Sequence, residues 1–240
     1  MAAPVAASKS MVYAFCDEAA EGAGVVAGFA DAAVVAAGLG VVVVFCAHAT
    51  AIMPRRRAET CKTYITPKTA FSLCKYLRSL EIRLRMEAAA TGSSPPPDIY
   101  LHITTNGGCI YSAFSIIDCF NSLSIPVNTV IDSNVSSAGT IISIHGAKRY
   151  ICDNSYVLIH ELRSGCWGKL AYIDDTYKNC LKIQEHINQI YLDKTKITKK
   201  YLKEILVKDL ELNADECIRM GIADEIYIGN RENRASKARL

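Results

Sequence analysis

Hydrophobic and polar positions along this chain form two kinds of pattern, a helical repeat of three or four residues and short apolar runs typical of strands. After Thr66-Pro67, a helix N-cap followed by proline at the first helical position, apolar side chains recur every three or four residues as far as Leu84. From Asp98 onward, short β-rich apolar runs alternate with helical patterns. The predicted strands are 60–65, 99–103, 127–131, 150–151 and 156–160, the predicted helices are 67–84, 111–123, 140–145, 174–192 and 199–206, and 88–97 is a predicted loop.

This alternation sets the fold class. Strands that alternate with helices over short connections form βαβ crossovers, so we expect an α/β fold with a mainly parallel sheet. Ligands in such sheets bind beyond the carboxyl ends of the strands. Two turns rich in small residues fall at such ends, Asn106-Gly107-Gly108 and Ser136-Ser137-Ala138-Gly139.

The first 54 residues differ from the rest and are rich in alanine, valine and glycine. Residues 33–53 contain one ionisable side chain, His48, and are followed by Arg55-Arg56-Arg57, a pattern that satisfies the rule for a membrane span. The run Val41 to Phe45 is equally typical of a buried strand. We therefore divide the chain into an apolar low-complexity arm, 1–54, a domain, 55–228, and a polar tail, 229–240. The arm is either a membrane span or a disordered or loosely packed extension.

Composition excludes several classes of protein. The chain of 240 residues is 50% hydrophobic and 21% charged, which excludes a wholly disordered protein. Lysine plus arginine, 27, nearly balance aspartate plus glutamate, 24, so no nucleic-acid partner is expected. None of the ten cysteines forms a Cys-x-x-Cys pair, which argues against a zinc ribbon and a dithiol redox motif. We expect free thiols, a cytoplasmic location, no metal and no cofactor.

The two small-residue turns suggest nucleophilic chemistry. Glycine lets another chain approach closely, and N–H groups at a helix start can hold a developing oxyanion. His160 closes an apolar strand, where an imidazole is well placed to take a serine proton. His102 and His145 are competing bases by composition. Taken one at a time, small-residue turns usually serve packing, and a histidine at a strand end is more often a satisfied polar group.

Four motifs in order resemble the Clp endopeptidase family. They are DIYLHITTNGG at 98–108, SSAG at 136–139, GAKRYICDNSYVLIH at 146–160 and NADECIRMGIAD at 213–224. The similarity runs from about residue 60 to residue 228. Trp167-Gly-Lys169 and residues 209–217 look more like divergent viral or phage members than bacterial housekeeping ones. The resemblance implies a crotonase-like ββα spiral with a long handle helix.

The resemblance also implies roles for individual residues. Ser137 takes the position of the nucleophile, with Ser136 as its rival, and His160 takes that of the general base. Backbone N–H groups of Gly108 (or Gly107) and of Ala138 would form the oxyanion hole.

The third member of the triad is the weak point of the resemblance. An ungapped match places Ile205 where the family has its catalytic aspartate, and isoleucine cannot orient an imidazole. Asp209 is the nearest candidate and Glu204 is the other. If neither acts, the chain is a weak Ser-His dyad or is inactive.

The family architecture implies partners. Residues 167–175 lead into the predicted handle helix, on which Ile173, Tyr177 and Ile187 share a stripe with Cys180 and Ile183. That stripe packs either within the monomer or between two stacked heptameric rings. Rings would enclose the nucleophiles, so substrates would be unfolded polypeptides delivered by an AAA+ unfoldase, because this chain has no Gly-x-x-x-x-Gly-Lys-Ser/Thr.

The function expected from these motifs is therefore that of an ATP-dependent, Clp-type serine endopeptidase. Two rivals remain. An inactive ring subunit would explain Ile205, and a crotonase-type acyl-CoA enzyme would share the spiral fold without needing a Ser-His pair.

Overall fold

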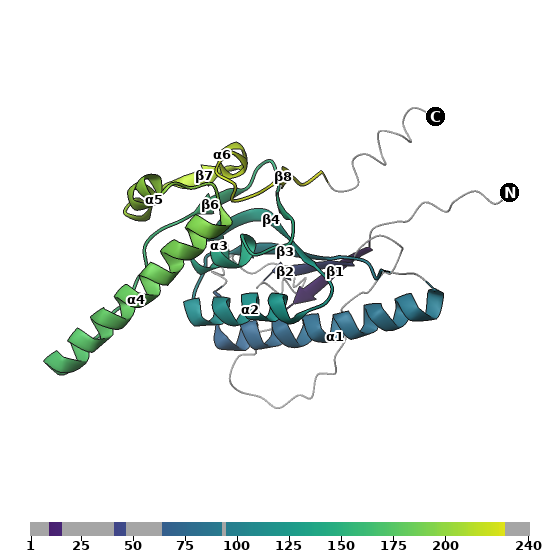
Figure 1. The fold of residues 1–240 in the computed structure, drawn as a ribbon, viewed down its shortest axis with the longest axis horizontal. Helices are drawn as coiled ribbons and strands as arrows, with labels where there is room; N and C mark the ends of the chain where they lie inside the picture. Colours follow the sequence, from purple (N-terminus) through teal and green to yellow (C-terminus); the bar gives the residue numbers. More distant parts are fainter. Residues whose placement is uncertain (1–9, 16–40, 47–63, 93–94, 229–240) are drawn as a thin grey trace, which may run out of the picture.

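A computed structural model describes residues 10–15, 41–46, 64–92 and 95–228 of the chain (Figure 1). The helices are α1 (Pro67–Thr91), α2 (Ile110–Ser122), α3 (Ala138–Ser143), α4 (Leu170–Lys194), α5 (Lys199–Leu206) and α6 (Ala214–Arg219). The strands are β1 (Ser10–Phe15), β2 (Val41–Cys46), β3 (Ile99–Thr105), β4 (Val127–Ser136), β5 (Arg149–Ile151), β6 (Tyr156–Leu158), β7 (Glu211–Asn213) and β8 (Glu225–Ile226).

Helix α1 begins where the sequence predicts and ends later. The Thr66 side chain accepts from the Thr69 backbone N–H in a capping box, and Pro67 is the first helical residue. The apolar stripe through Leu84 is buried. The predicted loop at 88–97 is wrong over 88–91, because three alanines continue the helix until Gly92 ends it in the left-handed conformation, φ 68°.

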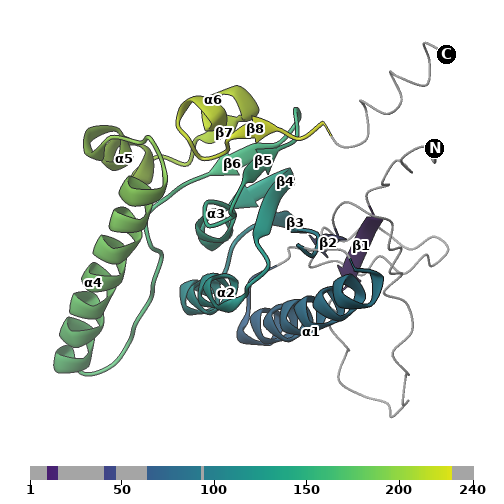
Figure 2. The same cartoon turned by 45° about the vertical axis from the view of Figure 1, so that its right-hand side comes forward.

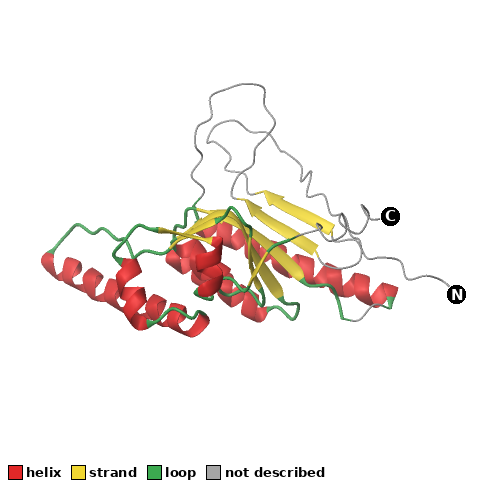
Figure 3. Cartoon of the chain, turned by 90° about the horizontal axis from the view of Figure 1, so that it is seen from above, coloured by secondary structure: helices red, strands yellow, loops and turns green. Residues whose placement is uncertain are grey.

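The sheet has the predicted parallel character. Its strands follow the order β1-β2-β3-β4-β5-β8, with every neighbouring pair parallel, while β6 pairs with the end of β4 and β7 runs antiparallel to β6. The helices gather on one side of the strands (Figure 3). The turned view in Figure 2 shows α3 close to α2 beneath the strands. The α/β fold class is therefore confirmed.

An irregularity in β4 shapes its carboxyl end. Ile103 of β3 pairs with Ile131, but Thr105 pairs with Val135, so β4 uses four residues where β3 uses two. A bulge of this kind bends a strand and redirects its end. Before the bulge β4 pairs with β5, and after it β4 pairs with β6.

Part of the predicted N-terminal arm belongs to the sheet. Residues 41–46 form β2 between β1 and β3, with Val41 paired to Ile99, so the strand interpretation of this run is confirmed and a helical span over it is wrong. The remainder of 33–53 lies outside the described residues, as do 60–63 of the predicted strand 60–65 and the predicted tail 229–240. In the part of the chain that the structure describes, no helix is long and apolar enough to cross a membrane.

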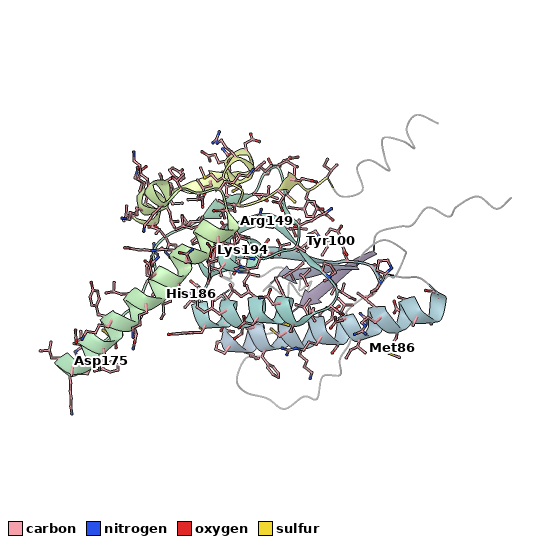
Figure 4. The ribbon with its side chains drawn as sticks, in the orientation of Figure 1. Met86, Tyr100, Arg149, Asp175, His186 and Lys194 are labelled. Atoms are coloured by element: carbon pink, nitrogen blue, oxygen red, sulfur yellow. The ribbon has the colours of Figure 1, made fainter. Side chains whose placement is uncertain are left out.

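Helix α4 extends away from the body of the molecule (Figure 1). Its C-terminal half is anchored by buried Ile187, Ile190 and Tyr191. Its N-terminal half is exposed, and Asp175 lies at the free end in Figure 4. The stripe predicted on this helix is therefore not buried within the monomer at Tyr177, which is 62% exposed, although it is buried at Ile187.

One arginine joins α4 to the sheet. The Arg149 guanidinium donates to the backbone oxygens of Lys194 and Gly221 at 2.6 and 2.7 Å, and it also pairs with the Asp224 carboxylate. Arg149 and Lys194 lie together at the inner end of α4 in Figure 4. The arginine side chain is largely buried and gives both carbonyl oxygens a charged donor, while Asp224 also accepts from the Arg149 backbone N–H at 2.9 Å.

We predict that Arg149→Met destabilises the protein by about 2–4 kcal/mol, because two carbonyl groups lose a charged donor and the Asp224 carboxylate loses its ion pair. Urea unfolding measures the change in the free energy of unfolding. Arg219→Met is the matched control, because Arg219 is exposed and only loosely paired with Glu216 at 3.9 Å, and its effect should stay within about 0.5 kcal/mol. Equal effects of the two variants would contradict the anchoring role of Arg149.

Candidate active site

The two small-residue turns meet because they follow neighbouring parallel strands. The turn after β3 leads into α2, and the turn after β4 leads into α3. A Cβ atom added to Gly107 would lie 2.6 Å from Ser137 Cβ and 2.8 Å from the Ser136 oxygen. Gly107 also has φ 94°. Only glycine satisfies both the contact and the backbone angle at this point.

Ser137 has an unusual backbone. Its φ of 56° and ψ of −127° make it the one described residue other than glycine with a positive φ. Such a conformation costs on the order of 1–3 kcal/mol and persists where surrounding contacts hold it. Its N–H donates to the Leu158 oxygen of β6 at 2.9 Å. The turn therefore stores strain directly beneath the serine side chain.

The structure distinguishes the two adjacent serines. Ser136 is buried and its hydroxyl donates to the Asn134 side-chain oxygen at 3.1 Å. Ser137 makes no side-chain capping bond and lines a cleft. Ser137 is thus the serine whose hydroxyl can meet a ligand.

Beside Ser137, two backbone N–H groups have no acceptor within the part of the chain that the structure describes. The Gly107 N–H donates to Thr105 Oγ1 at 3.1 Å, whereas those of Gly108 and Ala138 have no acceptor among the described residues. Ile65 holds the first loop, since its N–H donates to the Gly107 oxygen at 2.7 Å and its oxygen accepts from the Cys109 N–H at 2.8 Å. Of the two predicted glycines, Gly108 is therefore the one with a free donor.

A cleft of about 270 Å³ brings together four of the predicted residues, but neither Gly107 nor Asp209 is part of its lining. Ser137, His160, Gly108 and Ala138 all line it. Apolar side chains form much of the remaining wall, namely Ile110, Ile141, Leu162, Ile187 and Tyr191, and the rest of the lining comes from Tyr64, Asn106, Glu161 and Arg163. A hydroxyl, an imidazole and two free donors on one concave surface are the parts that acyl transfer requires.

His160 is oriented by a backbone oxygen. It lies just beyond β6, and its Nδ1 lies 2.6 Å from the Glu161 oxygen. A carbonyl oxygen can only accept, so Nδ1 carries the proton and the neutral ring keeps its lone pair on Nε2. The Glu161 N–H in turn donates to the Leu206 oxygen at 2.9 Å, and the Leu162 N–H donates to Gln184 Oε1 at 2.6 Å. These bonds fix the peptide that orients the imidazole.

The structure does not bring the predicted carboxylate to the imidazole. Both oxygens of Asp209 lie 2.9 Å from Nη2 of Arg163, and both side chains are exposed. Arg163 is three residues beyond His160 and always charged, so it attracts the carboxylate more strongly than a neutral ring does. Glu204 is exposed and Ile205 is buried in the core. No carboxylate of the described residues bonds to His160.

The competing histidines lie elsewhere. His102 is buried with its Nδ1 2.8 Å from Asp132, and the His145 Nδ1 lies 2.6 Å from the Ile141 oxygen. Burial lowers the pKa of His145. Neither residue lines the cleft. Within the described ranges, no group of three or more His, Cys, Asp or Glu side chains could hold a metal ion, and none of the cysteines described there forms a disulfide.

Sequence reasoning missed two features of this site. The Glu161 carbonyl carries no side-chain signal, so no pattern could have revealed that it orients His160. Arg163 does carry a signal, because an arginine close to the base can compete for any nearby carboxylate. The sequence alone does not show which carboxylate Arg163 binds, because Asp209 lies next to it only in the folded chain.

Gly139 packs closely against the Thr105 side chain, and this contact predicts how a larger residue at position 139 would change the stability. A Cβ at Gly139 would lie 2.4 Å from Thr105 Cγ2, so Gly139→Ala should destabilise the protein by about 1–3 kcal/mol. Gly165→Ala is the control, because a Cβ there meets nothing within 4 Å. Thr105→Ser removes Cγ2 but keeps the hydroxyl that binds Gly107, so it should restore most of the loss in the Gly139→Ala background. Denaturant unfolding measures all three, and failure of Thr105→Ser to restore stability would contradict the packing argument.

Comparison with known proteins places this site in a family. A family model described as Clp protease matches residues 86–230. The chain is 30% identical over 137 residues to the ATP-dependent Clp protease proteolytic subunit of Streptococcus gordonii, which covers 55% of this chain and 70% of that protein. A protein of the same description from Streptococcus suis is 29% identical over 136 residues, which are 55% of this chain and 69% of that protein. One from Deinococcus radiodurans is 25% identical over 146 residues, which are 60% of this chain and 72% of that protein. The chain belongs to the Clp protease family.

Proposed function

We propose that this chain is a serine endopeptidase that cleaves peptide bonds through an acyl-enzyme on Ser137. The single observation that carries the proposal is the strained turn at Ser137, which opens into the same cleft as His160 and two unoccupied N–H donors. Membership of the Clp protease family supports a peptidase of the serine type.

The proposed reaction assigns one role to each group. The Ser137 Oγ attacks the scissile carbonyl carbon while His160 Nε2 takes its proton. The carbonyl oxygen becomes an oxyanion that accepts from the N–H groups of Gly108 and Ala138. His160 then gives the proton to the leaving amine. Water repeats the sequence on the acyl-enzyme and releases the acid product.

In this proposal the Glu161 carbonyl replaces the carboxylate of a triad. It selects the same tautomer of His160, with the lone pair on Nε2. A carbonyl dipole stabilises an imidazolium ion less than a full negative charge does, so we expect a slower Ser-His dyad. Ile205 favours a second candidate function, a ring subunit with little or no activity, because its buried hydrocarbon cannot supply that charge.

A fluorophosphonate probe tests the nucleophile. We expect covalent labelling of the intact chain, complete loss of labelling in Ser137→Ala, and a fall of at least about a hundredfold in the labelling rate of His160→Ala, which lacks the general base. Intact-mass spectrometry quantifies the adduct.

The control for that experiment is Ser136→Ala, because Ser136 is adjacent but buried and hydrogen-bonded to Asn134. It should retain labelling. An intact chain that no concentration of probe labels would support the inactive ring subunit instead.

The ion pair at Asp209 generates a separate prediction. Because Arg163 holds Asp209, the variant Asp209→Asn should lower the labelling rate by no more than about threefold, whereas loss of an orienting carboxylate costs about 10⁴ in rate. Glu204→Gln provides a comparison at the other carboxylate the sequence suggested. A fall of more than about a hundredfold for Asp209→Asn would mean that the chain rearranges to form a triad.

We further propose that the chain works in stacked homo-oligomeric rings, with the seven subunits per ring that the resemblance to the Clp endopeptidase family implies. Helix α4 supports this, because its projecting half exposes apolar side chains that water disfavours and a second copy could cover. The exposed residues are Leu170, Tyr172, Tyr177 and Leu181, with Trp167 just before the helix.

The remaining partners follow from the ring. An enclosed chamber would admit only unfolded polypeptides. The relatives are named as proteolytic subunits of an ATP-dependent protease, and this sequence has no phosphate-binding Gly-Lys-Ser/Thr loop, so an AAA+ unfoldase would supply the ATP hydrolysis.

A further inference from the structure

The peptide that joins Ser137 to Ala138 is held from its carbonyl side. The Ser137 oxygen accepts from the backbone N–H of Thr140 at 2.9 Å and from Thr140 Oγ1 at 2.6 Å. The N–H of the same peptide belongs to Ala138 and has no acceptor among the described residues. Since C=O and N–H of a trans peptide point in opposite directions, holding the oxygen aims the N–H.

A second hydroxyl continues the chain of hydrogen bonds. Tyr191 of α4 bonds through its phenolic oxygen to Thr140 Oγ1. A threonine hydroxyl has a single proton, and Thr140 uses it on the Ser137 oxygen, so the Tyr191 hydroxyl must be the donor to Thr140. The direction is therefore Tyr191 to Thr140 to the Ser137 oxygen.

This relay is enclosed by protein. Thr140 is 0% and Tyr191 2% exposed, so neither bond competes with bulk water. Burial raises the pKa of Tyr191, which keeps its hydroxyl protonated and able to donate. In a medium of low dielectric constant, successive hydrogen bonds polarise one another, and a carbonyl that accepts strongly makes the N–H of its own peptide a better donor.

We propose that Thr140 and Tyr191 are positioning residues for the oxyanion hole, acting through the 137–138 peptide to orient and polarise the Ala138 N–H. The inference rests on the proposed function, because it needs an oxyanion to form at that N–H. It also links the site to α4, the helix whose far end projects from the body (Figure 1).

The test uses isosteric variants of the full chain. Tyr191→Phe removes only the outer hydroxyl, and Thr140→Val removes the inner one with little change of shape. Phosphonylation of Ser137 by a fluorophosphonate also develops charge on an oxygen in the hole. We expect the limiting labelling rate to fall by about three- to tenfold in Tyr191→Phe and by about ten- to a hundredfold in Thr140→Val, with the half-saturating probe concentration unchanged.

Matched variants separate positioning from folding. Thr140→Ser keeps the hydroxyl and should restore most of the rate. Tyr156→Phe removes an exposed hydroxyl from a tyrosine outside the relay and outside the proposed ring interface, and it should have no effect. Because Tyr191 acts only through Thr140, the double variant Tyr191→Phe/Thr140→Val should be no slower than Thr140→Val. Thermal unfolding of each variant identifies any that fails to fold. If Tyr191→Phe is one of these, the labelling rates of Thr140→Ser and Thr140→Val still test whether the Thr140 hydroxyl positions the Ala138 N–H.

The outcomes are distinct. If the probe labels the intact chain, Tyr191→Phe and Thr140→Val at the same rate, this inference is overturned while the proposed function stays in place. Rate losses that multiply in the double variant would overturn the relay, because Tyr191 would then act by another route. An intact chain that the probe never labels would overturn the proposed function and this inference with it.

Discussion

The strained backbone at Ser137 is the constraint on which the rest of the site depends. A residue with a side chain is forced into a conformation that suits glycine, and the fold holds it there from several sides. Leu158 accepts its N–H, Thr140 binds its oxygen, and Gly107 packs against it without a Cβ. Each contact comes from a different element, so the turn exists only when the sheet, α3 and the loop before α2 are assembled together.

That assembly explains how two donors come to face one serine. The bulge in β4 sends its carboxyl end from β5 toward β6, and the glycine turn after β3 follows alongside. Ile65 pins the glycine turn from outside the sheet, which leaves Gly108 free to donate while Gly107 is occupied by Thr105. The same sheet places His160 just beyond β6, within the same cleft. The functional groups are thus positioned by backbone pairing more than by contacts between their own side chains.

The tautomer of His160 is selected by a neutral acceptor, the Glu161 carbonyl oxygen, and not by a charged carboxylate. A backbone oxygen and a carboxylate both accept the Nδ1 proton, and both leave Nε2 as the base. They differ in how far they stabilise the imidazolium ion formed during reaction. In this chain Ile205 is buried in the core, and the nearby Asp209 is engaged by Arg163. In this structure the contact that selects the tautomer of His160 therefore brings no negative charge with it.

The sequence alone determined the α/β class, most element positions and the residues at the strand ends. Local chemistry suffices for these, as in the capping box of Thr66 and Thr69 and the proline at the first helical position of α1. Residues 88–91 show the limit of a periodic pattern, because three alanines and a threonine continue the helix beyond Leu84, the last leucine of the buried stripe. Tertiary structure decided the rest. The burial of Ser136 beside the cleft-lining Ser137, the pairing of Asp209 with Arg163, and the bond of Tyr191 to Thr140 either join residues far apart in the chain or depend on burial, which no local pattern encodes.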